Sequence, residues 1–146
     1  MRFMMIVKAN KDSEAGVMPG EELLAAMAKY NEELANAGVL VDLAGLQSSA
    51  KGFRVRIPSS GERTVTDGPF AETKELIAGY WIINVKSRAE AIAWAKRVPG
   101  PHGPNEECEI EVRQFFELED FAPSDAVEHH KKVGQQLAAT KKGTAA

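Results

Sequence analysis

VTDGPFAETKELIAGYWIINV, residues 65–85, is the stretch that decides the fold of this chain. Its second half, Ile77–Val85, is the most apolar run of the molecule, and its side chains alternate between two faces that are both apolar. This pattern is typical of a central strand that is covered on both sides. The first half contains a turn, Asp67–Phe70, and a charged connector, Glu72–Glu75, in which Glu72 and Lys74 would pair if the connector is extended. The stretch therefore predicts a turn that faces a cavity, followed by the central strand.

The residues before this stretch predict two strands, a helix and a hairpin. Five residues recur at helical spacing and predict a helix that ends at Gly38: Leu23, Met27, Tyr30, Leu34 and Ala37. The short apolar run Phe3–Val7 predicts a buried strand. Val39–Leu46 predicts a second strand, which Asp42 and Gly45 interrupt. Between residues 53 and 66, alternation on either side of Ser59-Ser60-Gly61 predicts a hairpin, whereas Asn10–Gly20 reads as a polar loop.

The residues after this stretch predict one more helix and one more strand. Ser87 and Glu90 have the spacing of a capping box, and the helix that they open is expected to reach about Val98. Its inward side chains are predicted to be Ala89, Ile92 and Ala93, with Lys96 as a further candidate. The final strand alternates apolar with charged residues over positions 108–113, which is typical of a sheet edge.

The order of these elements predicts an α+β protein with the ferredoxin-like βαββαβ arrangement and an added hairpin. Right-handed crossovers place both helices on one face of the sheet, and the first and third core strands are central. The other face, which includes Tyr80 and Ile82, then needs a cover. A second copy of the sheet would provide it in a homodimer closed by two-fold symmetry. The alternative is that the added hairpin and the C-terminal tail fold over this face within one chain.

The composition excludes several classes of protein. A formal net charge of −3 gives no basic patch for nucleic acid. The single cysteine, Cys108, forms neither an intramolecular disulfide nor a thiolate metal cage. The apolar run at Phe3–Val7 is too short for a signal peptide, and no run has the length of a membrane span, so a cytoplasmic protein without membrane association is predicted. We expect one domain over residues 1–121 and a partly mobile tail, 122–146, with a helix from Ser124 to about Ala139.

Asp67 is the first candidate for chemistry, and it has two interpretations. In the structural one, its carboxylate bonds the following backbone amides and Gly68 completes the turn. In the functional one, the turn places Asp67 in a mouth between sheet and helix, where it acts as a general acid or base. The sequence leaves both interpretations open.

The other candidates each have a simpler structural role as well. Tyr30 could donate a proton, but an aromatic residue within an apolar stripe also serves as core. His102, in a Gly/Pro loop, could shuttle protons or lie exposed. Arg54 and Arg56 could clamp an anion or form a solvated face of the hairpin. Phe70 could wall a pocket, and Tyr80 completes the predicted ligand contacts. There is no phosphate loop and no zinc-ligand spacing, so neither a metal nor a cofactor is predicted.

Residues 67–75, reading DGPFAETKE, and the following Gly79-Tyr80-Trp81-Ile82-Ile83 resemble the signature of the DGPF branch of the YCII-related proteins. Supporting similarities lie in Ala37–Leu40, in Gly45-Leu46 and in Glu109–Arg113, and the resemblance covers about residues 1–121. It implies a ferredoxin-like fold that pairs into a dimeric α+β barrel. For the wider YCII group it implies a His–Asp active site, with lyase activity on aromatic substrates among some relatives. Members of the DGPF branch are often encoded beside extracytoplasmic-function sigma factors.

The sequence departs from the wider group at the first helix, which carries no histidine, so the expected His–Asp pair cannot form there.

Two functional hypotheses follow. In the first, a small aromatic or carbonyl molecule binds near Asp67, which transfers a proton in lyase-like chemistry. In the second, the chain is a non-catalytic sensor or binds a sigma-factor-type partner through its tail or sheet edge.

Overall fold

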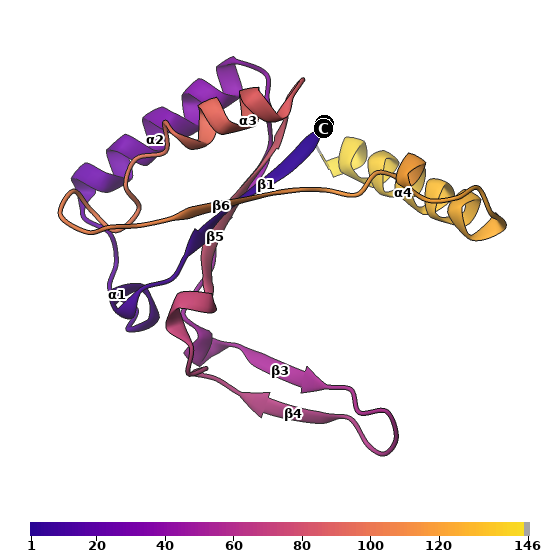
Figure 1. Ribbon diagram of the computed structural model, residues 1–146, viewed down its shortest axis with the longest axis horizontal. Helices are drawn as coiled ribbons and strands as arrows, with labels where there is room; N and C mark the ends of the chain where they lie inside the picture. The colour runs from indigo at the N-terminus through magenta and orange to yellow at the C-terminus, as the bar shows by residue number, and fades with distance from the viewer. Residues whose placement is uncertain (145–146) are drawn as a thin grey trace. The chain divides into compact units, whose positions relative to one another are not determined.

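The computed structural model describes residues 1–144 and divides the chain after Gln114 into two units, which we describe separately. The first unit contains a four-stranded sheet with helices and a two-stranded hairpin (Figure 1), so the predicted α+β class is confirmed. Its elements in chain order are β1 (Arg2–Lys8), α1 (Lys11–Glu14), α2 (Glu21–Asn36), β2 (Leu40–Gly45), η1 (Ser49–Lys51), β3 (Phe53–Arg56), β4 (Thr64–Asp67), η2 (Thr73–Glu75), β5 (Ile77–Asn84), α3 (Arg88–Ala95) and β6 (Ile110–Gln114).

The four-stranded sheet is antiparallel throughout and has the strand order β2-β5-β1-β6. The first and third core strands, β1 and β5, are therefore central, as predicted. They pair from Arg2 opposite Asn84 to Lys8 opposite Ile77, with a shift of register at Val7. The edge strands β2 and β6 complete the sheet on either side.

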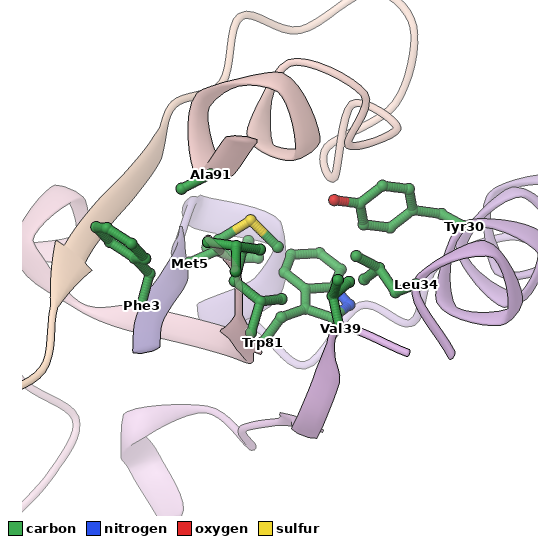
Figure 2. Packing of buried hydrophobic residues seen from close by; sticks show 10 residues of the cluster. Phe3, Met5, Tyr30, Leu34, Val39, Trp81 and Ala91 are labelled. Carbon is green, nitrogen blue, oxygen red and sulfur yellow. The ribbon is translucent and has the colours of Figure 1, made fainter. Parts of the chain in front are cut away.

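One face of the sheet is covered by α2 and α3, which lie together on the same side (Figure 1). The predicted stripe of α2 faces this core, with Tyr30 and Leu34 buried. Ala37, the last member of the stripe, is exposed because the helix ends at Asn36 and Gly38 turns the chain with a φ of 72°. Figure 2 shows the core side chains gathered between strands and helices, and the buried cluster is Phe3, Met5, Val7, Tyr30, Leu34, Val39, Trp81, Ile83, Val85 and Ala91.

The inward face of α3 differs from the prediction. Ala91 is buried and Trp94 packs against the core, whereas Ala89, Ile92 and Ala93 are exposed. The large indole of Trp94 sets the rotation of this short helix, because burying it removes more apolar surface from water than burying an alanine does. Ser87 caps the helix as predicted, accepting a hydrogen bond from the Glu90 amide at 3.1 Å.

Tyr30 is a core residue, with 3% of its surface exposed. Its hydroxyl donates a hydrogen bond to the backbone carbonyl of Trp94 at 2.8 Å, which ties α2 to α3. Its ring meets Trp81 edge-on, with centroids 5.6 Å apart. Burial raises the pKa of Tyr30 to about 12, while the charge of Arg97 lowers the pKa and that of Glu33 raises it.

The natural chain is expected to lose stability at alkaline pH because Tyr30 ionises on unfolding, and Tyr30→Phe is expected to abolish this loss. The unfolded chain ionises Tyr30 near pH 10.0, whereas the folded chain keeps the proton until about pH 12. The contribution of buried, protonated Tyr30 to stability is therefore complete below pH 10.0. As the pH rises further, ionisation favours the unfolded chain, so the free energy of unfolding is lower by about 1.4 kcal/mol at about pH 11. Urea unfolding at about pH 8 and about pH 11 measures this difference. Tyr30→Phe should cost about 1 kcal/mol at neutral pH through the lost hydrogen bond, and should show a smaller alkaline decline.

The matched control for this prediction is Tyr80→Phe, which retains Tyr30 and should show the full alkaline decline of the natural chain. An equal alkaline decline in Tyr30→Phe and in the natural chain would contradict the assignment.

The face of the sheet opposite α2 and α3, which we call the open face, carries Met4, Ile6, Tyr80 and Ile82. Ile6 is 5% exposed, and the other three residues are half-buried. The Tyr80 hydroxyl lies 3.5 Å from the Asp42 carboxylate of β2. Lys8 and Glu111 form an ion pair at 3.7 Å on the β1–β6 side. The central part of the open face is therefore apolar and its margins are charged.

The hairpin β3–β4 is exposed along both strands, so it does not lie over the open face of its own chain. The predicted alternation is confirmed. Arg54 and Arg56 pair across the strands with Thr66 and Thr64 on the polar face, while Val55 pairs with Val65 on the other. The alternative in which the hairpin covers the open face is thus not what the structure shows.

Two connecting segments differ from the prediction. Residues 10–20 contain the short helix α1, which Asn10 caps by accepting a hydrogen bond from the Ser13 amide at 2.8 Å. The connector that follows the Asp67 turn is not extended, because Thr73–Glu75 forms the 3₁₀ turn η2. Within residues 1–144, no ion pair joins Glu72 to Lys74.

The second unit begins at Phe115 and contains η3 (Leu118–Asp120) and α4 (Asp125–Thr144). Ser124 caps α4 as predicted, accepting a hydrogen bond from the Val127 amide at 3.2 Å, and the helix extends beyond the predicted end at Ala139. The predicted tail also includes residues 145 and 146, which lie outside the described part of the chain. Neither α4 nor any other helix within residues 1–144 is long and apolar enough to cross a membrane.

Candidate functional site

The turn after β4 is fixed by a close approach to the segment before β3. The Gly68 amide donates a hydrogen bond to the Gly52 carbonyl at 2.9 Å. A Cβ atom on Gly68 would lie 1.8 Å from the Ser49 carbonyl oxygen, so no residue with a side chain fits there without movement of the backbone. Glycine at position 68 is therefore required by contact with residue 49, and the Gly68–Pro69 peptide bond is cis.

Ser49 and Glu14 hold this turn from the other side, in an arrangement that we call the Glu14–Ser49 clamp. The Ser49 hydroxyl accepts a hydrogen bond from the Phe70 amide at 3.0 Å and donates a short one to the Glu14 carboxylate. The other carboxylate oxygen of Glu14 accepts from the Ser49 amide at 3.1 Å. Ser48 also donates a hydrogen bond to the Glu14 carbonyl at 2.8 Å. Three segments that are distant in sequence, those of Glu14, Ser49 and Phe70, therefore converge at this point.

A cavity of about 270 Å³ opens beside the clamp. Its apolar wall is formed by the side chains of Leu46, Phe70, Leu76 and Ile77. Its polar end contains Glu14, Gln47, Ser48, Ser49 and Lys51. A volume of this size, with an apolar wall and a few polar groups at one end, suits a small organic molecule that carries a polar substituent.

Arg54 extends the site toward the hairpin. Its guanidinium lies 3.8 Å from the centre of the Phe70 ring, in a cation–π contact that fixes the ring which walls the cavity. Arg54 is exposed to solvent, so its guanidinium is available to an anion. Phe70 and Arg54, both predicted as ligand contacts, are therefore brought together, whereas Arg56 lies further along the strand toward the hairpin loop.

Asp67 lies at the end of β4, exposed, and is not part of the cavity wall. Its carboxylate makes no side-chain hydrogen bond or ion pair with residues 1–144, so the bonds to the following amides that its structural interpretation requires are not present. Those amides bond to Gly52 and to Ser49 instead. The Asp67 carboxylate therefore makes no hydrogen bond that holds the turn.

The remaining predicted site residues lie elsewhere. Tyr30 is enclosed in the core between α2, α3 and β5, with its hydroxyl bonded to a backbone carbonyl. His102 lies half-buried in the loop between α3 and β6 and does not line the cavity at Phe70. Tyr80 is on the open face. A second cavity, about 410 Å³, is lined by the α3–β6 side of the unit, including Ile92, Lys96 and Cys108.

Glu14, Ser48 and Ser49 were not predicted from the sequence as site residues. The spacing of Asn10 and Ser13 was a signal for α1, and with it for Glu14, but the contact between Glu14 and Ser49 joins residues 35 positions apart. Among the described residues 1–144, no group of three or more His, Cys, Asp or Glu side chains is placed to hold a metal ion.

Comparison with known proteins places this chain in a family. A family model for the YCII-related domain matches residues 1–115, which is most of the chain. The chain belongs to the YCII-related family. The YCII-related match includes the complete sheet, both helices that cover it, and every residue of the clamp and of the cavity beside it.

This YCII-related chain is also similar to a protein from another organism over part of its length. An uncharacterised protein of Rhizobium meliloti (strain 1021) is 38% identical over 87 residues. The similarity covers 60% of the present chain and 64% of that protein, a little under two thirds of its length.

Proposed function

We propose that this YCII-related chain belongs to the DGPF branch and binds a small aromatic or carbonyl compound beside the Asp67 turn, with lyase-like acid–base chemistry at Asp67. The resemblance of residues 67–75 to the DGPF signature supports the branch. The proposal for the ligand rests on one observation, which is the cavity that joins an apolar wall at Phe70 to a polar end at Glu14 and Ser49.

The residues that line this cavity and those beside it support a division of roles. The ring of Phe70, fixed by Arg54, offers a flat apolar surface against which an aromatic ring or a conjugated carbonyl packs. Arg54 offers a guanidinium to a carboxylate or enolate oxygen, and Arg56 extends this positive charge along the hairpin. Asp67, which has no partner of its own among residues 1–144, is the proposed general acid or base.

The proposed assembly is a homodimer in which the open faces of two ferredoxin-like units pack on each other as a dimeric α+β barrel. The apolar centre of this face, with Met4, Tyr80 and Ile82, supports the proposal, because the hairpin of the same chain does not cover it. Two-fold symmetry lets one surface cover itself, so the assembly closes with two chains. Tyr80 would then lie at the interface.

Calorimetric melting of the natural chain and of Asp67→Asn tests the ligand proposal, with phenols, aromatic keto acids and simple carbonyl compounds as probes. At about 1 mM, a probe with a dissociation constant of about 100 µM adds about 1.4 kcal/mol to the stability of the folded state. For a chain of this size the melting temperature then rises by about 4 °C. The natural chain should show this shift with at least one probe class, and Asp67→Asn should show a smaller one.

Glu62→Gln is the matched control, because it removes an exposed carboxylate from the hairpin loop without touching the turn. It should respond to every probe as the natural chain does. If no probe shifts the natural chain, or if Asp67→Asn responds like Glu62→Gln, the proposed role of Asp67 is wrong. Turnover of a stabilising probe, lost in Asp67→Asn, would extend the result from binding to catalysis.

A second candidate function is a non-catalytic sensor or a module that binds a partner of the sigma-factor type. The exposed aromatic pair Phe116 and Phe121, with ring centroids 5.4 Å apart, supports it, as do the exposed Val133 and Leu137 of α4. Under this alternative, a chain that ends at Glu117 loses partner binding while Asp67→Asn retains it.

A further inference from the structure

The apolar face of the hairpin β3–β4 is a large exposed surface within the first unit. Phe53, Val55, Ile57 and Val65 are 64%, 48%, 63% and 64% exposed. Val55 and Val65 are opposite each other across the two strands, so their side chains emerge on the same face. The opposite face carries Arg54, Arg56, Thr64 and Thr66. The hairpin is thus one-sided, with an apolar face that unit 1 leaves uncovered.

A two-stranded hairpin in water is marginally stable by itself, and it becomes stable when one of its faces packs on another surface. Only the root of this hairpin is tied to the sheet unit, through Gly68 to Gly52 and through Phe70 to Ser49. The remaining length of both strands is exposed on both faces. The alternation of Phe53, Val55 and Ile57 with Arg54 and Arg56 therefore indicates a partner surface for one face.

We propose that this apolar face packs on a second copy of the chain, so that each copy of the dimer grips the other with its hairpin. The inference rests on the proposed homodimer and adds a second contact to it. In a two-fold dimer, the hairpin of each copy extends past the edge of the paired open faces, and its apolar face packs on the partner copy. The same contact then occurs twice, and the assembly remains closed.

The area of this face suits a second copy. The four apolar residues leave about 400 Å² exposed on one hairpin, which is on the order of the largest apolar patch found on ordinary monomers. Two hairpins and the two surfaces that they cover would bury about 1,600 Å², which is the size of a standard stable interface. The area buried by the two hairpins alone would therefore match a standard interface, without the area of the open faces.

Asp67 marks the end of the apolar face that is nearest to the turn. Asp67 is directly opposite Phe53 in the hairpin, so the two side chains share the apolar face. The carboxylate of Asp67 is exposed and lies at the end of β4, so the proposed contact leaves it at the edge of the covered surface. Arg54, which contacts Phe70 at the candidate site, lies on the opposite face of the hairpin, so the proposed contact leaves that side of the site open.

Analytical ultracentrifugation of the natural chain, Val55→Asp and Thr66→Asp tests the contact. Both variants place the same charge in the middle of the hairpin, but on opposite faces. The natural chain and Thr66→Asp should have the mass of two chains at micromolar concentration. Val55→Asp should weaken the dimer at least about 100-fold, because the new carboxylate must be buried in an apolar interface.

Thiol reactivity tests the same contact without adding a charge, and it gives an answer even if Val55→Asp does not fold. In a Cys108→Ala background, Val55→Cys and Thr66→Cys each carry one thiol on the hairpin. The thiol at position 55 should react at least about tenfold more slowly in the concentrated dimer than after dilution to monomer, as expected for a thiol that the partner covers. The thiol at position 66 should react at one rate throughout.

The outcomes separate this inference from the proposed homodimer. A natural chain that is dimeric, with Val55→Asp equally dimeric and a thiol at 55 that is never protected, overturns the hairpin contact and leaves the dimer standing. Protection that does not change with concentration shows that the chain covers its own hairpin, and it also overturns the inference. A natural chain that is monomeric overturns both.

Discussion

Gly68→Ala is expected to destabilise the folded chain by about 3 kcal/mol and to abolish any ligand response at the candidate site. The added Cβ would meet the Ser49 carbonyl oxygen at 1.8 Å, so either the turn or the segment before β3 has to move. Movement of either separates the Gly68 amide from Gly52 and the Phe70 amide from Ser49. Urea unfolding followed by circular dichroism measures the loss of stability, and the probe that shifts the natural chain measures the loss of the site.

Gly52→Ala is the matched control for this substitution. A Cβ at position 52 would lie 3.5 Å from the same Ser49 carbonyl oxygen, which is an ordinary van der Waals distance. The backbone carbonyl of residue 52 is unchanged, so it still accepts the hydrogen bond from Gly68. The control should cost less than about 1 kcal/mol. If the two substitutions have the same effect on stability, the close approach of Gly68 to Ser49 is not what holds the turn.

Leu34→Ala should cost about 3 kcal/mol of unfolding free energy, within the range for leucine side chains deleted from rigid cores. Leu34 is 0% exposed and lies in the cluster between α2 and the sheet, so its removal leaves a void that the surrounding strands cannot fill. The loss should appear as a lower urea midpoint with an unchanged slope, because the surface exposed on unfolding remains nearly the same.

Leu24→Ala makes the same chemical change on the same helix, at a residue that is 53% exposed. Both substitutions replace leucine by alanine within α2, so differences in helix propensity cancel in the comparison. The control should cost less than about 1 kcal/mol. Equal losses for the two variants would mean that α2 presents a different face to the sheet.

Patterns that repeat along the chain predicted most of the fold. The alternation in Ile77–Val85 and the apolar run Phe3–Val7 gave the two central strands, because only a strand covered on both faces is apolar on both. The prediction was wrong for the rotation of α3. That helix carries alanines at 89, 91, 93 and 95, which periodicity does not distinguish, and the position of one large residue, Trp94, decides which alanine is buried.

The candidate site could be predicted only in part. Asp67-Gly68-Pro69 was recognisable as a turn, since the local conformational preferences of its residues are strong. The Glu14–Ser49 clamp could not be predicted, because Glu14, Ser49 and Phe70 come from three separate segments. None of these residues has a distinctive pattern of neighbours in the sequence. The exposure of the hairpin could not be predicted from the sequence either. Alternation shows which face is apolar, but it carries no information on whether the same chain or another covers that face.

The aromatic cluster around Tyr30 also gives this protein a built-in optical probe. Its tyrosines and tryptophans are Tyr30, Tyr80, Trp81 and Trp94, and all four precede Gln114, so intrinsic fluorescence reports on the first unit and not on α4. Trp81 is 6% exposed and its indole nitrogen donates to Asn31 at 2.7 Å, so unfolding transfers it from a fixed apolar site into water. Its emission should therefore shift to longer wavelength as the sheet opens, whereas helical circular dichroism also follows the melting of α4. A difference between the two melting curves would show that the two units melt separately.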